Sequence, residues 1–141
     1  MIDRPRVARK IAAVRDAVAR IRDVLPSDVQ AFTGDRTARE VVLLNLFVAL
    51  QECIALATHW VADEGWGVPA SYREAFELLA DRGVIEPALA ARLAPAVGLR
   101  NLVAHRYGAL DWVRIHELAS TRLGDLEEYV AALATAARAG P

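Results

Sequence analysis

The chain has very little cysteine, lysine or aromatic side chain. Cys53 is its only cysteine, so a disulfide within the chain is impossible and a zinc site made of four cysteines cannot be built. Aromatic residues make up 6% of the composition, and Lys10 is the only lysine among 17 basic residues. With 55% hydrophobic residues and a net charge of -1, the 141 residues argue against a disordered chain and a globally basic nucleic-acid binder. We therefore expect a single domain over residues 1–141, in a reducing, cytoplasmic setting.

A long, uninterrupted hydrophobic run is also absent. Residues 1–25 carry charges throughout and lack the apolar stretch of a signal peptide. Residues 41–62 come nearest to a membrane span, but four polar or charged side chains interrupt them: Asn45, Gln51, Glu52 and His59. A helix buried on most sides, in a bundle or at a dimer seam, is the favoured interpretation, and a membrane-associated protein is the alternative.

Apolar residues recur at helical spacing along most of the chain. Six of them near the start are separated by three or four positions: Val7, Ile11, Val14, Val18, Ile21 and Leu25. This pattern predicts a helix over residues 5–25, ending before Pro26. Thr37 and Glu40 form a capping-box pattern, which predicts that a second helix starts at Thr37 and ends near Asp63.

Two further helices are predicted in the middle of the chain. Ser71 begins a short one by the same capping-box spacing, and Gly83 is expected to end it. The next begins at Pro87 and runs toward His105, and Pro95 is expected to kink or split it.

The last part of the chain predicts one more helix. Asp111 is expected to cap it, and its apolar face extends from Val113 to Leu133, with Gly124 as a weak point. No segment has the alternating pattern of a strand. The sequence therefore predicts an all-α bundle of four to five helices.

Residues 98–108 hold the densest group of reactive polar side chains: Arg100, Asn101, His105 and Tyr107. On an ideal helix Asn101 and His105 lie one turn apart on one face, whereas Arg100 and His105 are about 140° apart. Arg100 and His105 can therefore converge only if the helix ends or bends near His105, or if a second copy of the chain contributes.

These side-chain types suit cleavage of an RNA phosphodiester without a metal. Histidine can act as general base or acid near neutral pH, and arginine can stabilise charge that develops on phosphate. The structural alternative makes His105 a hydrogen-bonded residue at a helix end, Tyr107 a half-buried anchor and Arg100 an ordinary surface cation. The pattern alone leaves both interpretations open.

Other candidates for chemistry are weaker. His59 stands on the apolar second helix, where a hydrogen-bonded core or interface histidine is expected rather than a ligand. His116 lacks the partner spacing of a zinc helix, and Glu127 and Glu128 are adjacent, so they point in different directions. Cys53 is expected to be buried and inert.

Charge is distributed unevenly along the chain. Residues 1–22 hold seven basic side chains against two acidic ones, Asp3 and Asp16, and the remainder of the chain is acidic. A positive first helix could guide a polyanion. A solvated helix face and a dock for an acidic protein are the alternatives.

The four residues between Arg100 and His105, followed by Tyr107, resemble the signature of HEPN-domain ribonuclease toxins. The whole chain is similar to the HepT-like toxins of that superfamily, through the stretches AVGLRNLVAHRYGALDW, SYREAFELLADRGVIEPALAARL and LATHWVADEG. The resemblance covers nearly the entire chain. Pro95 departs from the uninterrupted helix expected before the motif, which puts the approach of Arg100 in doubt but leaves the motif complete.

The resemblance implies a HEPN-type helical bundle that forms a homodimer, with two motifs facing a shared cleft. It implies a metal-independent endoribonuclease toxin of a type VII toxin-antitoxin pair. Such a toxin acts on RNA, needs no cofactor and does not associate with a membrane. Arg100 and His105 would be the catalytic pair and Asn101 a supporting polar residue. Tyr107 would receive AMP from ATP through an MntA-like nucleotidyltransferase antitoxin, which silences the toxin. The alternative function is a non-catalytic helical subunit that binds a nucleotidyltransferase or a nucleotide.

Overall fold

The computed structural model describes residues 1–105 and 110–140, with the backbone alone at Val97, Ala104 and His105. Within these residues every regular element is a helix, which confirms the predicted all-α class. The described residues form seven helices rather than four or five. The additional ones are a short helix that the periodicity missed and a division of the last predicted helix.

Helix α1, Arg4–Val24, buries the stripe of apolar residues from Val7 to Ile21, as predicted. The helix starts one residue earlier than expected, because the Asp3 carboxylate accepts a hydrogen bond from the backbone N–H of Arg6. The basic side chains of α1 lie on its other faces, where most are exposed. The amphipathic reading of this segment is therefore confirmed.

Between α1 and the next long helix, the five residues of α2, Val29–Thr33, form a helix that the sequence did not predict. Helix α3, Arg36–Glu64, follows directly. Its cap is Asp35, which accepts from the N–H of Ala38, so the prediction that Thr37 begins this helix was wrong. Aspartate is at least as good an N-cap as threonine, and it stands two residues earlier.

Helix α3 is the central element of the fold. It packs against α1 and against four of the later helices, and twelve of its residues are buried. Among the described residues it is the one helix long and apolar enough to span a membrane, yet 50% of the relevant window is buried inside the fold. Gly65 ends it with a left-handed backbone (φ 69°), a conformation that favours glycine. The helix is thus part of the bundle, as expected, but it is buried over about half of its apolar window rather than on most sides.

The next two helices agree with their predicted boundaries. Helix α4, Tyr72–Asp81, is capped by Ser71, whose hydroxyl accepts from the N–H of Glu74, and Gly83 follows its end with φ 75°. Helix α5, Pro87–His105, begins at the predicted proline. It continues through Pro95 as one helix, so of the two effects expected of Pro95, a kink or a split, the split does not occur.

The last predicted helix is two helices, α6 (Trp112–Thr121) and α7 (Leu123–Ala139). Asp111 caps α6 as expected, by accepting from the N–H of Arg114. The break comes at Arg122 rather than at Gly124. Ser120 and Thr121 donate their hydroxyls to backbone carbonyls four residues earlier, a pattern that weakens and bends a helix end.

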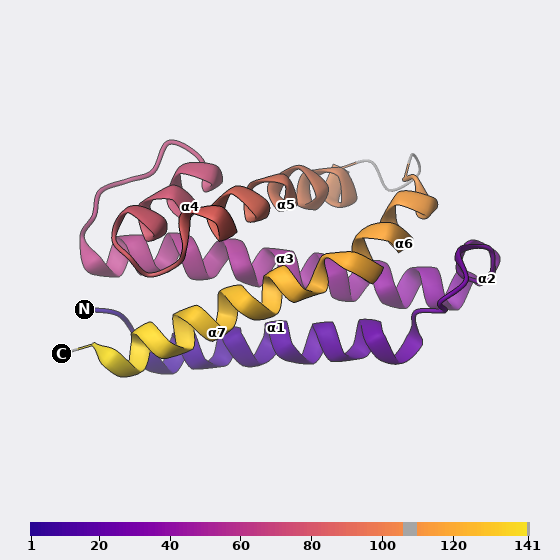
Figure 1. The fold of residues 1–141 in the computed structure, drawn as a ribbon, viewed down its shortest axis with the longest axis horizontal. Coiled ribbons are helices and arrows are strands. Elements are labelled where there is room, and N and C mark those ends of the chain that lie inside the picture. Colours follow the sequence, from indigo (N-terminus) through magenta and orange to yellow (C-terminus); the bar gives the residue numbers. More distant parts are fainter. Residues whose placement is uncertain (106–109, 141) are drawn as a thin grey trace.

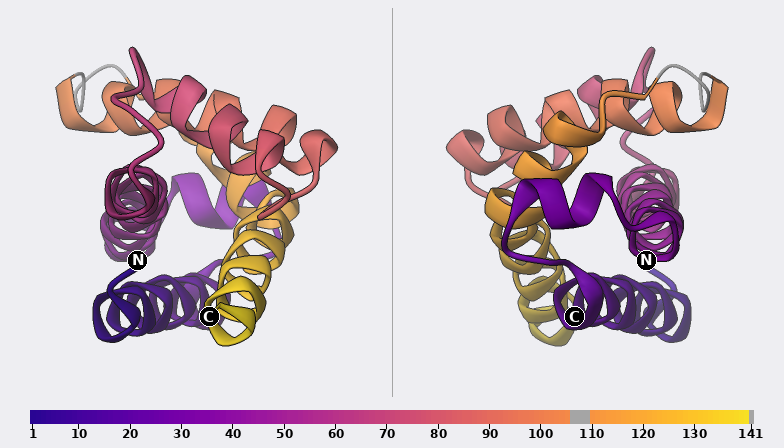
Figure 2. Two further views of the ribbon diagram at one scale, coloured as in Figure 1. Left: turned by 90° about the vertical axis from the view of Figure 1, so that its left-hand side faces the viewer. Right: turned by 90° about the vertical axis from the view of Figure 1, so that its right-hand side faces the viewer.

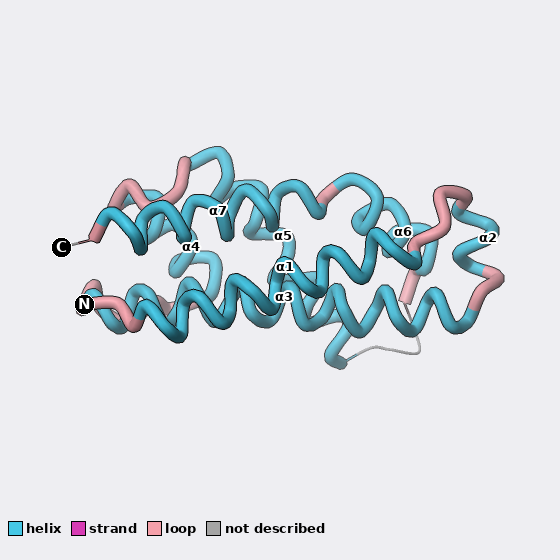
Figure 3. The backbone as a smooth tube through the Cα atoms, turned by 90° about the horizontal axis from the view of Figure 1, so that it is seen from below, coloured by secondary structure: helices cyan, strands magenta, loops and turns pink. Residues whose placement is uncertain are grey.

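The helices form a bundle that is easiest to follow end-on. Helices α1, α3 and α7 form three of its sides, and α4 with α5 closes the fourth (Figures 1 and 2). Seen from below, α1 lies along α3 for most of its length (Figure 3). Helix α5 contacts α3, α4 and α7, so the motif-bearing helix and the basic first helix lie on different sides of the bundle.

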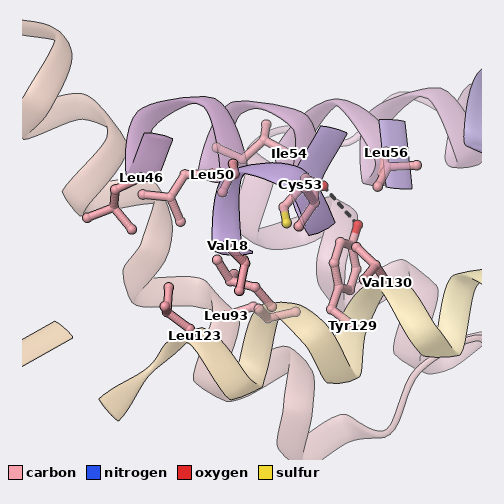
Figure 4. Close-up of a cluster of buried hydrophobic side chains, with 14 of the residues drawn as sticks. Val18, Leu46, Leu50, Cys53, Ile54, Leu56, Leu93, Leu123, Tyr129 and Val130 are labelled. Carbon is pink, nitrogen blue, oxygen red and sulfur yellow. Dashed lines mark hydrogen bonds between the residues drawn. The ribbon is translucent and has the colours of Figure 1, made fainter. Parts of the chain in front are cut away.

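The core lies between these layers and contains a buried hydrogen bond between α7 and α3. The Tyr129 hydroxyl on α7 donates to the backbone carbonyl of Cys53 on α3 at 2.9 Å (Figure 4). The Tyr129 ring meets Phe76 edge-on, with 5.7 Å between centroids. This link joins α3, α4 and α7 around a single core.

Candidate functional site

Arg100 of α5 is held against α3 by a glutamine. The Nε of Arg100 donates to the Oε1 of Gln51 at 2.8 Å, across 49 positions of sequence. Its Nη1 donates to the Oδ1 of Asn101 at 3.0 Å. Both Arg100 and Gln51 are half-buried. The guanidinium therefore has a defined position although it stands near the surface.

An aromatic ring supports the same guanidinium from α3. The ring centroid of Phe47 lies 5.8 Å from the Cζ of Arg100, within the range of a cation–π contact. Phe47 and Gln51 are four residues apart, so they lie on the same face of α3, one turn from each other. Two side chains of one helix thus define the place of Arg100.

The partners of Arg100 are neutral. Among the described residues no carboxylate pairs with it, whereas the half-buried cations Arg6 and Lys10 pair with Asp63 and Glu52 at 3.1 and 3.0 Å. Guanidinium groups bind phosphate well because their N–H donors match its oxygens in pairs. Since no carboxylate cancels its charge, Arg100 is suited to bind an anion.

The other motif residues are described to different extents. Asn101 is exposed and accepts the hydrogen bond from Arg100, and its supporting role stays a prediction. The backbone of α5 includes His105, but the structure does not describe its side chain. Tyr107 lies outside the described residues. The expected convergence of Arg100 and His105, and the expected role of Tyr107, therefore stay predictions.

An apolar groove of about 640 Å³ lies beside the motif, between α3, α5, α6 and α7. Leu46 and Leu50 form its α3 wall, and Leu99 and Leu102 belong to its α5 wall. Neither Arg100 nor the two residues that hold it lines this groove. The groove and the arginine therefore use different faces of the same two helices.

The weaker candidates have structural partners. His59 is half-buried and accepts a hydrogen bond at Nδ1 from Arg6 at 3.4 Å, as expected of a hydrogen-bonded interface histidine. His116 is only 8% exposed, and its Nε2 lies 2.7 Å from the carbonyl oxygen of Pro26. Cys53 is buried, and burial raises the pKa of its thiol, which agrees with an inert cysteine.

Glu127 and Glu128 diverge, as their adjacency predicted. Glu127 pairs with Arg22 of α1, and Glu128 pairs with Arg92 of α5. The hydrogen bond from Arg22 lowers the pKa of Glu127. In residues 1–105 and 110–140, no group of three potential ligands from histidine, cysteine, aspartate and glutamate is placed to hold a metal ion.

The sequence did not predict that Gln51 and Phe47 belong to this site. In the sequence, Gln51 is one of the polar interruptions of an apolar segment, and Phe47 is an apolar residue of that segment. The signal that could have identified them is a polar residue, Gln51, within a largely apolar helix, with an aromatic residue one helical turn before it. Which arginine they hold depends on the packing of α5 on α3, and that packing is not encoded in local spacing.

Known proteins are similar to this chain over most of its length. The family described as Ribonuclease HepT-like matches residues 14–133 of the chain. The mRNA nuclease HepT of Shewanella oneidensis is 32% identical over 124 residues, which cover 88% of this chain and 92% of that protein. The match includes the motif and the helices that carry its supports.

Solved structures are similar over nearly the full length. The tri-AMPylated HEPN toxin of Shewanella oneidensis in complex with MNT antitoxin superposes with a TM-score of 0.83 at 31% identity, covering 96% of this chain and 99% of that one. YutE of Bacillus subtilis, a cytosolic protein of unknown function, has the same TM-score at 13% identity, over 98% of this chain and 92% of its own. The second likeness shows the fold alone. With the family match and the close relative together, the chain belongs to the HepT-like ribonuclease family of HEPN proteins.

Proposed function

We propose that the chain is a metal-independent endoribonuclease toxin of a toxin–antitoxin pair, acting in the cytoplasm. The observation that carries this proposal is Arg100, a positioned guanidinium on the motif helix whose partners are neutral amides. Arg100 binds the scissile phosphate and stabilises the charge that develops on it in the transition state. His105 removes the proton from the ribose 2′-hydroxyl or protonates the leaving oxygen. Asn101 supports Arg100.

The active form in this proposal is a homodimer. Helix α3 leaves apolar side chains uncovered beside the arginine's supports: Leu44 is 63% exposed, and Val41 and Val48 are half-buried. These positions lie three, four or seven residues apart, so they share a face of α3. A second copy packed there would cover the stripe and bring two motifs near each other. This would meet the condition that Arg100 and His105 converge between chains.

Silencing in this proposal occurs by AMPylation at Tyr107. An MntA-like nucleotidyltransferase would transfer AMP from ATP to the tyrosine hydroxyl and release pyrophosphate. The relative from Shewanella oneidensis is tri-AMPylated and in complex with an MNT antitoxin, which supports this regulation. Tyr107 belongs to the same short motif as Arg100. In this proposal the added negative phosphate competes with an RNA phosphate for the guanidinium.

Expression and cleavage assays with single variants test the function. We expect wild type to arrest growth and to cleave RNA, and we expect His105→Ala to lower cleavage about 100-fold or more, the usual contribution of a general acid or base. Arg73→Ala is the control because this exposed arginine pairs with Glu77 on its own helix and, among the described residues, with no other carboxylate. Thermal unfolding must show that each variant is folded. Wild-type cleavage rates in His105→Ala would overturn the proposed mechanism, and a non-catalytic partner subunit would then be the better assignment.

Mass spectrometry tests the regulation separately. Incubation with the cognate nucleotidyltransferase and ATP should add mass to the peptide that contains Tyr107, and Tyr107→Phe should prevent the addition. If that peptide keeps its mass while the transferase modifies another residue, the role of Tyr107 is wrong.

A further inference from the structure

We propose that Gln51 is the positioning residue of Arg100, and that its neutrality is as important as its reach. This inference rests on the proposed function, because it concerns how the phosphate-binding arginine is held. Gln51 fixes the guanidinium through a hydrogen bond without cancelling its charge. A carboxylate at the same place would hold the arginine more strongly and leave it less able to bind RNA.

The N–H donors of Arg100 are only partly used within the protein. A guanidinium has five N–H groups: one on Nε and two on each Nη. The Gln51 amide oxygen accepts from Nε and the Asn101 oxygen accepts from Nη1. This leaves one N–H on Nη1 and both on Nη2, and no partner for Nη2 lies in the described part of the chain. Adjacent N–H groups on Nη1 and Nη2 form the paired donor that phosphate oxygens prefer.

Two consecutive residues of α3, Gln51 and Glu52, hold different cations in different ways. Gln51 presents an amide to Arg100, whereas Glu52 presents a carboxylate to Lys10 at 3.0 Å. The ion pair joins α3 to α1, and its charges cancel each other. The amide contact joins α3 to α5, and the positive charge is preserved. The carboxylate of Glu52 therefore holds α1 and α3 together through an ion pair. The amide of Gln51 holds Arg100 and leaves its positive charge uncancelled.

The Arg100 guanidinium is also immobilised by an aromatic ring. Phe47 supports the guanidinium one helical turn before Gln51, with its ring centroid 5.8 Å from the Arg100 Cζ. An arginine side chain has many rotamers, and fixing it before the substrate binds removes an entropic cost from the bound state. The Gln51 hydrogen bond and the Phe47 ring together confine the group to one place. Gln51 acts on the reaction through Arg100 and not on RNA directly.

The decisive variant is Gln51→Glu, which keeps the size and the acceptor but adds a negative charge. We expect it to fold with an unchanged or raised midpoint of thermal unfolding, because it can form an ion pair with Arg100. We expect kcat/KM for RNA cleavage to fall at least tenfold. The salt dependence of RNA binding should also become shallower by about one phosphate contact, since one cation is neutralised. A purely structural role predicts the same stability but full activity and an unchanged salt dependence.

Two further variants complete the experiment. Gln51→Leu removes the acceptor without adding charge, and we expect a smaller loss of activity than in Gln51→Glu. Gln30→Glu makes the same chemical change at an exposed position on α2 and should cleave RNA at the wild-type rate. In an Arg100→Ala background, Gln51→Glu should have little additional effect, because the two residues act as one unit.

The outcomes separate this inference from the proposed function. Gln51→Glu cleaving RNA within twofold of a cleaving wild type would overturn the role of Gln51 and leave the nuclease assignment intact. A Gln51→Leu activity at or below that of a folded Gln51→Glu would overturn the charge argument. A wild type that does not cleave RNA, or an Arg100→Ala variant with full activity, would overturn the proposed mechanism and this inference with it.

Discussion

Helix α5 has two halves that differ on either side of Pro95. In the first half, Leu89 and Leu93 are fully buried, and Arg92 pairs with Asp125 and Glu128 of α7. In the second half, Leu99 and Leu102 are half-buried against the apolar groove, and Arg100 is held by amides. The first half is joined to the core by burial and charge, whereas the second half is attached more lightly.

One helix thus serves both stability and function. An arginine paired with two carboxylates gains a fixed place and loses its free charge, as Arg92 does. An arginine held by neutral oxygens gains a place and keeps its charge, as Arg100 does. The half of α5 that carries the motif is less buried, and it is the half to which we assign the binding of RNA. The four predictions below test this division.

The largest effect is expected from the two arginines of α5. Arg100→Ala should lower kcat/KM for RNA cleavage about 100- to 1,000-fold, the usual loss when one transition-state donor is removed. Its midpoint of thermal unfolding should fall only slightly, since it loses the hydrogen bond with Gln51 but no ion pair. Arg92→Ala, the matched control, should keep its activity and unfold at a slightly lower temperature. Equal losses of activity in the two variants would show that the halves of α5 are not functionally distinct.

The second prediction concerns the leucines of the same helix. Leu93→Ala should lower the free energy of unfolding by about 2–5 kcal/mol, because it creates a cavity in the core. Leu99→Ala should cost about 1 kcal/mol, because its side chain is only half-buried and loses fewer contacts. Urea denaturation of both variants gives the two values. A Leu99→Ala cost as large as that of Leu93→Ala would contradict the looser packing of the second half.

The third prediction addresses the boundary itself. A proline inside a helix is about 3 kcal/mol less favourable than alanine, because it lacks an N–H and its ring crowds the preceding turn. Pro95→Ala should therefore raise the free energy of unfolding by about 1–3 kcal/mol, measured by urea denaturation. Pro69→Ala, in the loop between α3 and α4, should give no such gain, since proline restricts an unfolded loop. A destabilised Pro95→Ala would show that the proline is required for the packing of α5.

Most of the fold could be predicted from the sequence where periodicity and capping agree. The stripe from Val7 to Ile21 identified α1, and Ser71 with Gly83 identified α4, because these signals are local. The division of the last helix at Arg122 was missed because apolar residues keep their helical spacing across it, from Ile115 to Leu126 and beyond. Helix α2 was missed because five residues are too few to show a period.

The candidate site could be predicted only in part. Arg100 and Asn101 stand in one short motif, so a sequence pattern can identify them. The contact with Gln51 joins residues 49 positions apart, and it depends on how α5 lies across α3. A polar residue within an apolar helix indicates only that some partner is needed when it is partly buried. The identity of that partner is a property of packing, which is why Gln51 was missed.

The smallest expected effect separates ion-paired arginines from the amide-held one by pH. The hydrogen bond from Arg22 lowers the pKa of Glu127 below its unfolded value, so the pair stabilises the fold above the unfolded pKa. This contribution is lost as the pH falls through the lowered pKa of the folded state. The pair is largely exposed, so Glu127→Gln should cost under about 1 kcal/mol at neutral pH and still less at acidic pH. The cost of Gln51→Leu should not change over the same range, because an amide does not titrate. Urea denaturation between neutral and acidic pH measures both costs, and a Gln51→Leu cost that disappears on acidification would show that Arg100 is held by a charge.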